Sequence, residues 1–340
     1  MTRIPYQEIY EVLIKVLLKA GFDSERAAAC ARLFTDSSRD GVYSHGLNRF
    51  PRFMEMIQNG VIDIHARPEL ICSAGALERW DGRRGPGNLN ASACMQQAIA
   101  LSRRHGLGCV ALANNNHWMR GGSYGWQAAE AGVIGICWTN TMPNLPPWGA
   151  IEPRLGNNPL VIAVPRLDGH IVLDIALSQF SFGALESYSQ RHEQLPVFGG
   201  FDLQGELTRD ATAIEASNRL LPIGFWKGSG LALMLDLLAA LLSGGKATYQ
   251  IAPESLKETG LSQVFLAFDP SLIDRGSGKV NVNVADQIIQ YVLGAQASSE
   301  AVVRYPGQKT LEIRKQNLAE GIPVEPEVWK RICNSVNRDP

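Results

Sequence analysis

The chain has 340 residues, with 32 Lys and Arg against 33 Asp and Glu, so its formal net charge is -1. This length can bury a large apolar core in one or two domains. The near-neutral balance excludes the basic surface that nucleic acids or anionic membranes require. We therefore expect a small-molecule substrate, no nucleic acid and no membrane, and other copies of the same chain as partners.

About the first 60 residues read as amphipathic helices. Residues 9–17 have apolar side chains at helical spacing with Glu8, Glu11 and Lys15 among them, which is unlike a secretory signal. Asp23 directly precedes a second apolar-periodic stretch, so we expect it to cap that helix.

Six cysteines occur singly without any CxxC pair, a pattern typical of buried thiols in a reducing compartment. The longest apolar run, residues 231–242, contains Asp236 and is short for a bilayer span. These features predict a soluble cytoplasmic protein.

From residue 69 onward, short apolar runs alternate with helical stretches such as residues 91–105. Alternating strand and helix patterns predict an α/β or α+β domain over residues 69–297. The charged tail, residues 298–340, returns to helix-friendly sequence, and we expect it to join residues 1–68 in a helical domain. The predicted strands are residues 70–75, 109–114, 134–140, 160–165, 170–177 and 264–269.

Two glycine motifs are candidates for phosphate binding. Residues 106–111, GLGCVA, follow a helical pattern and precede a strand pattern, the reverse of a dinucleotide-binding loop. Gly228-Ser229-Gly230 follows Trp226-Lys227 and opens an apolar helix, so its N–H groups could hold an anion. A glycine-rich helix entry with a solvated lysine is the alternative that composition favours. No metal-binding motif is present, and we expect no metal.

Two histidines stand in polar, turn-like surroundings: His45 in YSHGLNRF and His117 in NNNHWMRGGSYGW. For each histidine by itself, a structural role as a hydrogen-bonding loop residue is favoured over catalysis. Reduction of a ketone requires a proton donor near the carbonyl oxygen, and imidazole suits this near neutral pH. Arg49 or Arg120 could bind a substrate carboxylate. The other four histidines read as surface residues.

Six segments, in order and spacing, closely resemble the non-Rossmann malate/L-lactate dehydrogenase family: GVYSHGLNRFPRF, ANNNHWMRGGSYGWQAAEAG, IGICWTNTMPNLPPWGA, GNNPLVIAVP, LPIGFWKGSGLALMLDLLAALLSGG and YPGQK. The resemblance implies an α/β (α+β) fold, in which helices wrap a mostly antiparallel sheet and both chain ends form a helical domain. It also implies a homodimer with the active site at its interface.

The resemblance assigns roles to individual residues. His45 is the expected acid/base, with His117 as the second candidate, and Arg49 and Arg120 are the expected substrate ligands. Many family members carry Thr where this chain has Leu177, which leaves the cofactor contacts there open. The implied NAD contacts are His170, Ile171, Val172, Leu173, Asp174, Ile175, Ala176, Trp226, Lys227, Gly307, Gln308 and Lys309.

Together these features predict NADH-dependent reduction of a polyhydroxylated 2-keto acid at C2. The asparagine, arginine and serine side chains near His117 would bind the hydroxyls, and the Trp-containing loops would form the dimer interface. Asp174 is a candidate for the carboxylate that favours NAD over NADP. The alternatives are a malate/lactate-type enzyme for another 2-keto acid, a binding protein without turnover, and a structural homo-oligomer.

Overall fold

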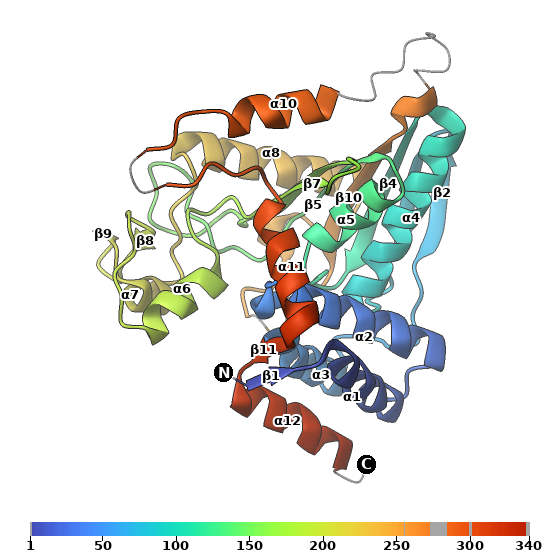
Figure 1. Cartoon of the computed structure of the whole chain (residues 1–340), viewed down its shortest axis with the longest axis horizontal. Helices are drawn as coiled ribbons and strands as arrows, with labels where there is room; N and C mark the ends of the chain where they lie inside the picture. The colour runs from blue at the N-terminus through green and yellow to red at the C-terminus, as the bar shows by residue number, and fades with distance from the viewer. Residues whose placement is uncertain (1, 255, 273–283, 299–300, 338–340) are drawn as a thin grey trace.

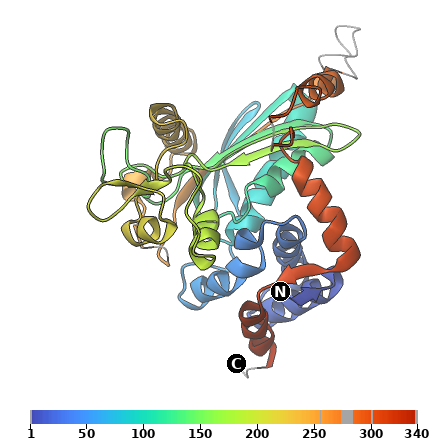
Figure 2. The ribbon, with the colours of Figure 1, turned by 60° about the vertical axis from the view of Figure 1, so that its left-hand side comes forward.

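The computed structural model describes residues 2–254, 256–272, 284–298 and 301–337. A seven-stranded sheet with helices on its faces lies above a layer of helices from both ends of the chain (Figure 1). Figure 2 shows the same two parts from a second direction.

The helical layer contains α1 (Tyr6–Lys19), α2 (Ser24–Arg39), α3 (Phe50–Gln58) and α12 (Pro326–Asn337). Its apolar stripes meet in one buried cluster that includes Ile9, Leu13, Phe34 and Ile332. Asp23 caps α2 as predicted, because its carboxylate accepts a hydrogen bond from the Arg26 N–H at 2.8 Å. Two short strands, β1 (Thr2–Ile4) and β11 (Ile322–Val324), pair and join the two chain ends. They were not predicted, because a strand of three residues is too short to show an alternating pattern.

The main sheet has the strand order β2-β3-β4-β10-β5-β6-β7. Every pair is antiparallel except β3 with β4. This confirms the mostly antiparallel sheet, and all six predicted strands form. The predicted strands are β2 (Glu69–Ala74), β4 (Leu107–Asn115), β5 (Ile134–Thr139), β6 (Leu160–Val164), β7 (Ile171–Ile175) and β10 (Leu261–Phe268). The seventh strand, β3 (Leu77–Asp81), was not predicted.

Helices cover both faces of the sheet because side chains alternate between the faces along each strand. On β4, Val110 and Leu112 pack with α4 (Gly87–His105) and α5 (Gly122–Glu130), whereas Cys109 and Ala111 pack with α8 (Trp226–Ser243). Gly106 ends α4 with a φ of 82°, so the GLGCVA segment is a helix-to-strand turn, as predicted. The remaining elements are α6 (Phe182–Gln190), β8 (Gly200–Phe201), β9 (Leu207–Thr208), α7 (Ala211–Ser217) and α10 (Val284–Leu293).

Helix α8 is longer than the apolar run that predicted it. Within the described part of the chain it is the one helix that is long and apolar enough to cross a membrane by those two criteria. Here it packs one face on the sheet, and its buried Asp236 accepts a hydrogen bond from Asn140 Nδ2 at 2.9 Å. The expectation from length was therefore wrong, since the helix includes residues 226–230 as well.

The cysteines follow the prediction only in part. Cys30, Cys94, Cys109 and Cys137 are buried. Cys72 is exposed because β2 forms one edge of the sheet and presents every residue to solvent.

Helix α11 (Gln308–Glu320) runs between the sheet and the helical layer in both views (Figures 1 and 2). At its start, Gly307 lies against Val172 of β7. Near its end, Asn317 Nδ2 donates a hydrogen bond to the Arg39 carbonyl at 2.9 Å. The chain's C-terminal part thus connects one edge of the sheet with α2.

Candidate active site

The His45 segment is shaped by close packing against α2. Two short 3-10 turns, Tyr43–His45 and Leu47–Arg49, flank Gly46. A Cβ on Gly46 would collide with the Ser38 side chain and backbone. The Leu47 N–H also donates to Ser38 Oγ at 2.8 Å. The glycine after His45 is therefore required for this approach, and α2 positions His45 and Arg49 on either side of it.

The His117 loop is built by its own asparagines. Asn116 Nδ2 donates to the carbonyls of Arg84 at 2.7 Å and Gly85 at 2.9 Å, and Asn115 Nδ2 donates to Gln263 Oε1 at 2.8 Å. Both asparagines are fully buried. They support the loop and are not available to substrate hydroxyls, contrary to the expectation from sequence.

The two histidines lie next to each other. Their ring centroids are 5.8 Å apart and the ring planes differ by 18°. Ser44 Oγ lies within hydrogen-bonding distance of His45 Nδ1, at 3.0 Å. The Met119 N–H donates to His117 Nδ1 at 3.0 Å. A neutral His117 ring therefore carries its proton on Nε2 and can donate a hydrogen bond from that side.

Positive charge dominates around the pair. Burial, together with Arg49 and Arg120, lowers the pKa of His45 to about 4. Burial, Arg49 and His45 hold the pKa of His117 well below its usual value. Burial and the nearby Arg52 lower the pKa of Arg49 to about 10, so this guanidinium remains charged at neutral pH.

Arg49 differs from the other arginines near the histidines because its charge is not paired. Among the residues that the structure describes, its guanidinium has no hydrogen bond and no ion pair. The buried Glu258 offsets part of its charge from a distance. A half-buried cation without a partner is costly unless an anion binds to it. Arg49 beside the histidine pair is therefore suited to bind a carboxylate.

Arg120 is also close to His45, but it is already paired. Its Nη1 donates to Asp40 Oδ2 at 2.7 Å, and both side chains are buried. Nearby, the Gly122 N–H at the start of α5 donates to Asp174 Oδ2 at 2.8 Å. Asp174 is open to solvent, yet the surrounding protein raises its pKa.

The three segments assigned to the cofactor lie along β7, which is the other edge of the sheet. At its start, Gly307 has a φ of 94°, and a Cβ there would lie 3.0 Å from the Val172 nitrogen. At its end, the Ile223 N–H donates to the Leu177 carbonyl at 2.9 Å, and the exposed Trp226 and Lys227 follow. The arrangement fits an extended ligand along the strand, with one segment at each end.

Leu177 and Gly228 add two details about these segments. The Leu177 side chain lies in the apolar core beneath the sheet, so this chain has an apolar contact where many family members have a hydroxyl. Gly228 lies inside α8, where a Cβ would collide with the Ile223 carbonyl. Gly228 is therefore required for packing in the first turn of α8, whereas a Cβ on Gly230 would meet open space.

Three charged residues near the site were missed from sequence: Asp40, Arg52 and Glu258. Asp40 follows a helix in the run SRDG, and Glu258 lies in SLKETG, where both read as solvated turn residues. Only their burial, at 3% and 4% exposed, separates them from surface carboxylates.

The tryptophans divide between core and surface. Trp118 and Trp126 are buried in the core beside the sheet. They therefore cannot anchor an interface, contrary to the expectation from sequence. Trp148 is 54% exposed and contacts Phe225, with ring centroids 5.4 Å apart.

One pocket in the described part of the chain is lined by neither histidine. It measures about 390 Å³ and lies between α3 and α12, with Phe50, Met54 and Arg331 among its lining residues. The candidate active site is therefore identified by the unpaired charge of Arg49 and the stacked rings of His45 and His117, and not by a deep pocket.

The chain matches a known family over nearly its whole length. Residues 4–333 match the family model described as malate/L-lactate dehydrogenase. Proteins described as 2,3-diketo-L-gulonate reductase from Citrobacter koseri and Escherichia coli K12 are each 45% identical over 332 residues, covering 97% of this chain and 99% of the relative.

Solved structures share the whole fold. A putative malate/lactate dehydrogenase from E. coli superposes with a TM-score of 0.90 at 25% identity, covering 99% of this chain and 95% of that one. Sulfolactate dehydrogenase from Methanocaldococcus jannaschii superposes at 0.88 with 26% identity, covering 99% and 98%. The chain belongs to the malate/L-lactate dehydrogenase family and is an oxidoreductase of the nicotinamide-dependent kind.

Proposed function

We propose that the protein reduces the C2 ketone of 2,3-diketo-L-gulonate to 3-keto-L-gulonate with NADH, and that His45 donates the proton. The observation that carries this proposal is the unpaired Arg49 beside the stacked pair His45 and His117. The curated relatives at 45% identity support the choice of substrate.

Each residue of the site has a distinct role in this reaction. Arg49 binds the substrate carboxylate through paired N–H donors, and Arg120 adds positive charge nearby. His117 donates a hydrogen bond from Nε2 to the reacting oxygen and holds it. NADH, when bound, supplies the hydride to the carbonyl carbon. His45 then gives its proton to the oxygen, which would otherwise keep the negative charge.

The pKa of His45, about 4 in the absence of ligands, has a consequence for this role. The imidazole is neutral at pH 7 until negative charge arrives. A carboxylate bound at Arg49 supplies that charge and raises the pKa of His45. Substrate binding therefore prepares the proton donor, and the neutral ring suits the reverse reaction as a base.

For the cofactor, we propose that residues 170–176, Trp226, Lys227 and Gly307–Lys309 hold NAD along β7. The solvent-accessible carboxylate of Asp174 on this strand repels a 2′-phosphate, which favours NADH over NADPH.

We further propose that the protein works as a homodimer. Helix α8 carries a row of exposed apolar side chains on the face turned away from the sheet: Leu231, Met234, Leu237, Leu238 and Leu241, between 39% and 71% exposed. The exposed aromatic group of Trp148, Phe225 and Trp226 lies near its start. Apolar areas of this kind mark interfaces, and α8 begins with two of the proposed cofactor residues.

The central test is NADH oxidation by the purified protein with 2,3-diketo-L-gulonate, pyruvate and oxaloacetate in parallel. We expect the sugar acid to have the highest kcat/KM, and NADPH to be poorer than NADH. His45→Asn should lower kcat by about 100-fold or more while NADH still binds, measured by fluorescence. Wild-type turnover in this variant would exclude His45 as the proton donor, and His117→Asn would then identify the alternative.

A second candidate function is reduction of another 2-keto acid. Solved relatives of the same fold include delta1-piperideine-2-carboxylate reductase from Pseudomonas syringae, at 26% identity and a TM-score of 0.88 with 98% and 100% coverage. Higher kcat/KM with oxaloacetate or pyruvate than with the sugar acid would favour this alternative. NADH binding without any oxidation would favour a binding protein, and light scattering that shows an active monomer would contradict the homodimer.

A further inference from the structure

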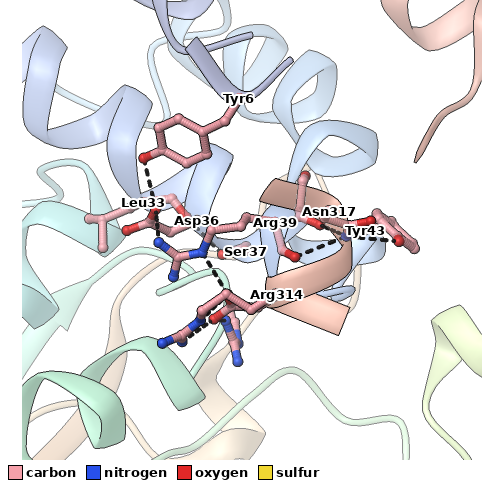
Figure 3. Close-up of polar contacts among 11 residues, drawn as sticks. Tyr6, Leu33, Asp36, Ser37, Arg39, Tyr43, Arg314 and Asn317 are labelled. Carbon is pink, nitrogen blue, oxygen red and sulfur yellow. Dashed lines mark hydrogen bonds and ion pairs between the residues drawn. The ribbon is translucent and has the colours of Figure 1, made fainter. Parts of the chain in front are cut away.

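One buried carboxylate near the active site binds three arginines. Asp40 Oδ1 accepts hydrogen bonds from Arg39 Nε at 2.8 Å and Arg314 Nε at 2.7 Å. Its Oδ2 accepts from Arg314 Nη2 and Arg120 Nη1, both at 2.7 Å. The Asp40 side chain is 2% exposed. Figure 3 shows Arg39 and Arg314 close together in this cluster, with Tyr6 and Asn317 at its edges.

The three arginines come from segments with different tasks. Arg120 follows His117 by three residues, and Asp40 precedes His45 by five. Arg314 belongs to α11, whose first turn carries the proposed cofactor residues. Its guanidinium also lies 4.4 Å from the ring centroid of Trp126 in α5. Asp40 is therefore the point where the histidine segments, the cofactor helix and the N-terminal helices are tied together.

Arg120 reaches from this cluster to the active site. Its Nε would lie 3.3 Å from a Cβ on Gly122, and Asp174 Oδ2 would lie 2.7 Å from the same position. Its charge acts on both His45 and Asp174. Arg120 therefore lies near a second carboxylate, Asp174, as well as Asp40.

We propose that Asp40 is a positioning residue of the active site, which holds Arg120 beside His45 and cancels part of its charge there. This inference rests on the proposed role of His45 as proton donor. Asp40 does not touch the substrate in this role. It acts through Arg120 and so sets how readily His45 holds a proton.

The sign of the effect follows from the charges around His45. Those acting on it are Arg49 from the turn after Gly46, Arg120 from the loop before α5, and the neighbouring ring of His117. Removing the negative charge of Asp40 exposes His45 to the full charge of Arg120, which disfavours the imidazolium. Removing the charge of Arg120 favours it. The two substitutions must therefore shift the titration of His45 in opposite directions.

The test is the pH profile of kcat/KM for reduction in the full-length enzyme. Reduction needs protonated His45, so the rate falls as the pH rises through its titration. We expect Asp40→Asn to move this limb to lower pH by about half a unit or more, and Arg120→Gln to move it to higher pH by a similar amount. Asp40→Glu, which keeps the charge, should restore the wild-type position.

Asp36→Asn is the matched control. Asp36 accepts hydrogen bonds from Arg39 at 2.9 Å and from Tyr6 at 2.8 Å in the same cluster but contacts neither Arg120 nor Arg314 among the described residues. A purely structural role of the cluster predicts similar changes in kcat for both aspartate variants and no displaced limb in either.

Limbs that stay in place, or that move in the same direction in Asp40→Asn and Arg120→Gln, would overturn the proposal. Should Asp40→Asn fail to fold, Arg120→Gln still decides, because a limb that does not move to higher pH contradicts it. His45→Asn separates this question from the function itself. If the limb persists in that variant, His45 is not the group that titrates and the proposed role of His45 fails. If the limb vanishes in His45→Asn but does not move in Asp40→Asn, only the proposed role of Asp40 fails.

Discussion

Arg49 and Arg314 show how the same side chain serves different purposes. Arg314 makes two hydrogen bonds to Asp40 and covers the ring of Trp126. Arg49 has no hydrogen bond or ion pair with any residue in the described ranges, although it is half-buried. A paired buried charge holds segments together, whereas an unpaired one has kept its binding capacity for a ligand. The comparison separates a structural cluster around Asp40 from the proposed binding site around Arg49.

The largest effect is expected at Arg49. Arg49→Gln removes the charge that we propose binds the substrate carboxylate, so kcat/KM should fall by about 100-fold, the scale of a lost charged hydrogen-bond pair. The melting temperature should stay the same or rise, because an unpaired buried cation disappears. Steady-state kinetics and thermal unfolding measure both. Arg49→Lys, which keeps the positive charge, is the control for charge alone. A large loss of stability with normal kinetics in Arg49→Gln would show that Arg49 has a structural role and does not bind substrate.

The opposite pattern is expected at Arg314. Arg314→Gln leaves Asp40 with Arg39 and Arg120 only, so the free energy of unfolding should fall by about 2 kcal/mol. The KM for the keto acid should change less than in Arg49→Gln, because Arg314 is not among the charges that act on either histidine. Denaturant unfolding provides the measurement. Equal stability of this variant and the wild type would show that the cluster contributes little to the fold.

The smallest effect is expected in the pH dependence of stability, where the two regions titrate in different windows. The pKa of His45 is lowered from 6.5 to about 4 by burial, Arg49 and Arg120. Because the unfolded chain binds this proton more readily, stability is full above pH 6.5 and is lost as the pH falls toward 4. Burial opposes ionisation of Asp40, but hydrogen bonds from Arg314 and Arg39 lower its pKa from 3.8 to about 2. Its contribution is therefore lost only as the pH falls from 3.8 toward 2.

Melting temperatures recorded between pH 8 and pH 3 separate these windows. We expect His45→Asn to flatten the decline between pH 6.5 and 4, whereas Asp40→Asn should keep this decline and extend it to lower pH, because it lowers the pKa of His45 further. Identical pH profiles for His45→Asn and the wild type would contradict the low pKa of the imidazole.

The sequence alone was sufficient for the main elements of the sheet and for the family. Apolar runs such as residues 109–114 have the period and length of strands, and local patterning of this kind survives folding. The SHG and NNNHW motifs also marked both histidines, because unusual polar residues in turns stand out against an apolar background. Short strands such as β1, with three residues, have too little pattern to be recognised.

Only the tertiary structure showed which polar residues are available to a ligand and which hold the fold together. Asn115 and Asn116 resemble ligand-binding residues in sequence, but both are fully buried and hold the loop of His117. Asp40 resembles a solvated turn residue, but it is buried under three arginines from distant parts of the chain. The free energy of a charge depends on its burial and its partners, and those are properties of the packed fold. Sequence therefore identified the chemical groups, and only their arrangement in space separated Arg49, which is free to bind, from Arg120 and Arg314, which are paired.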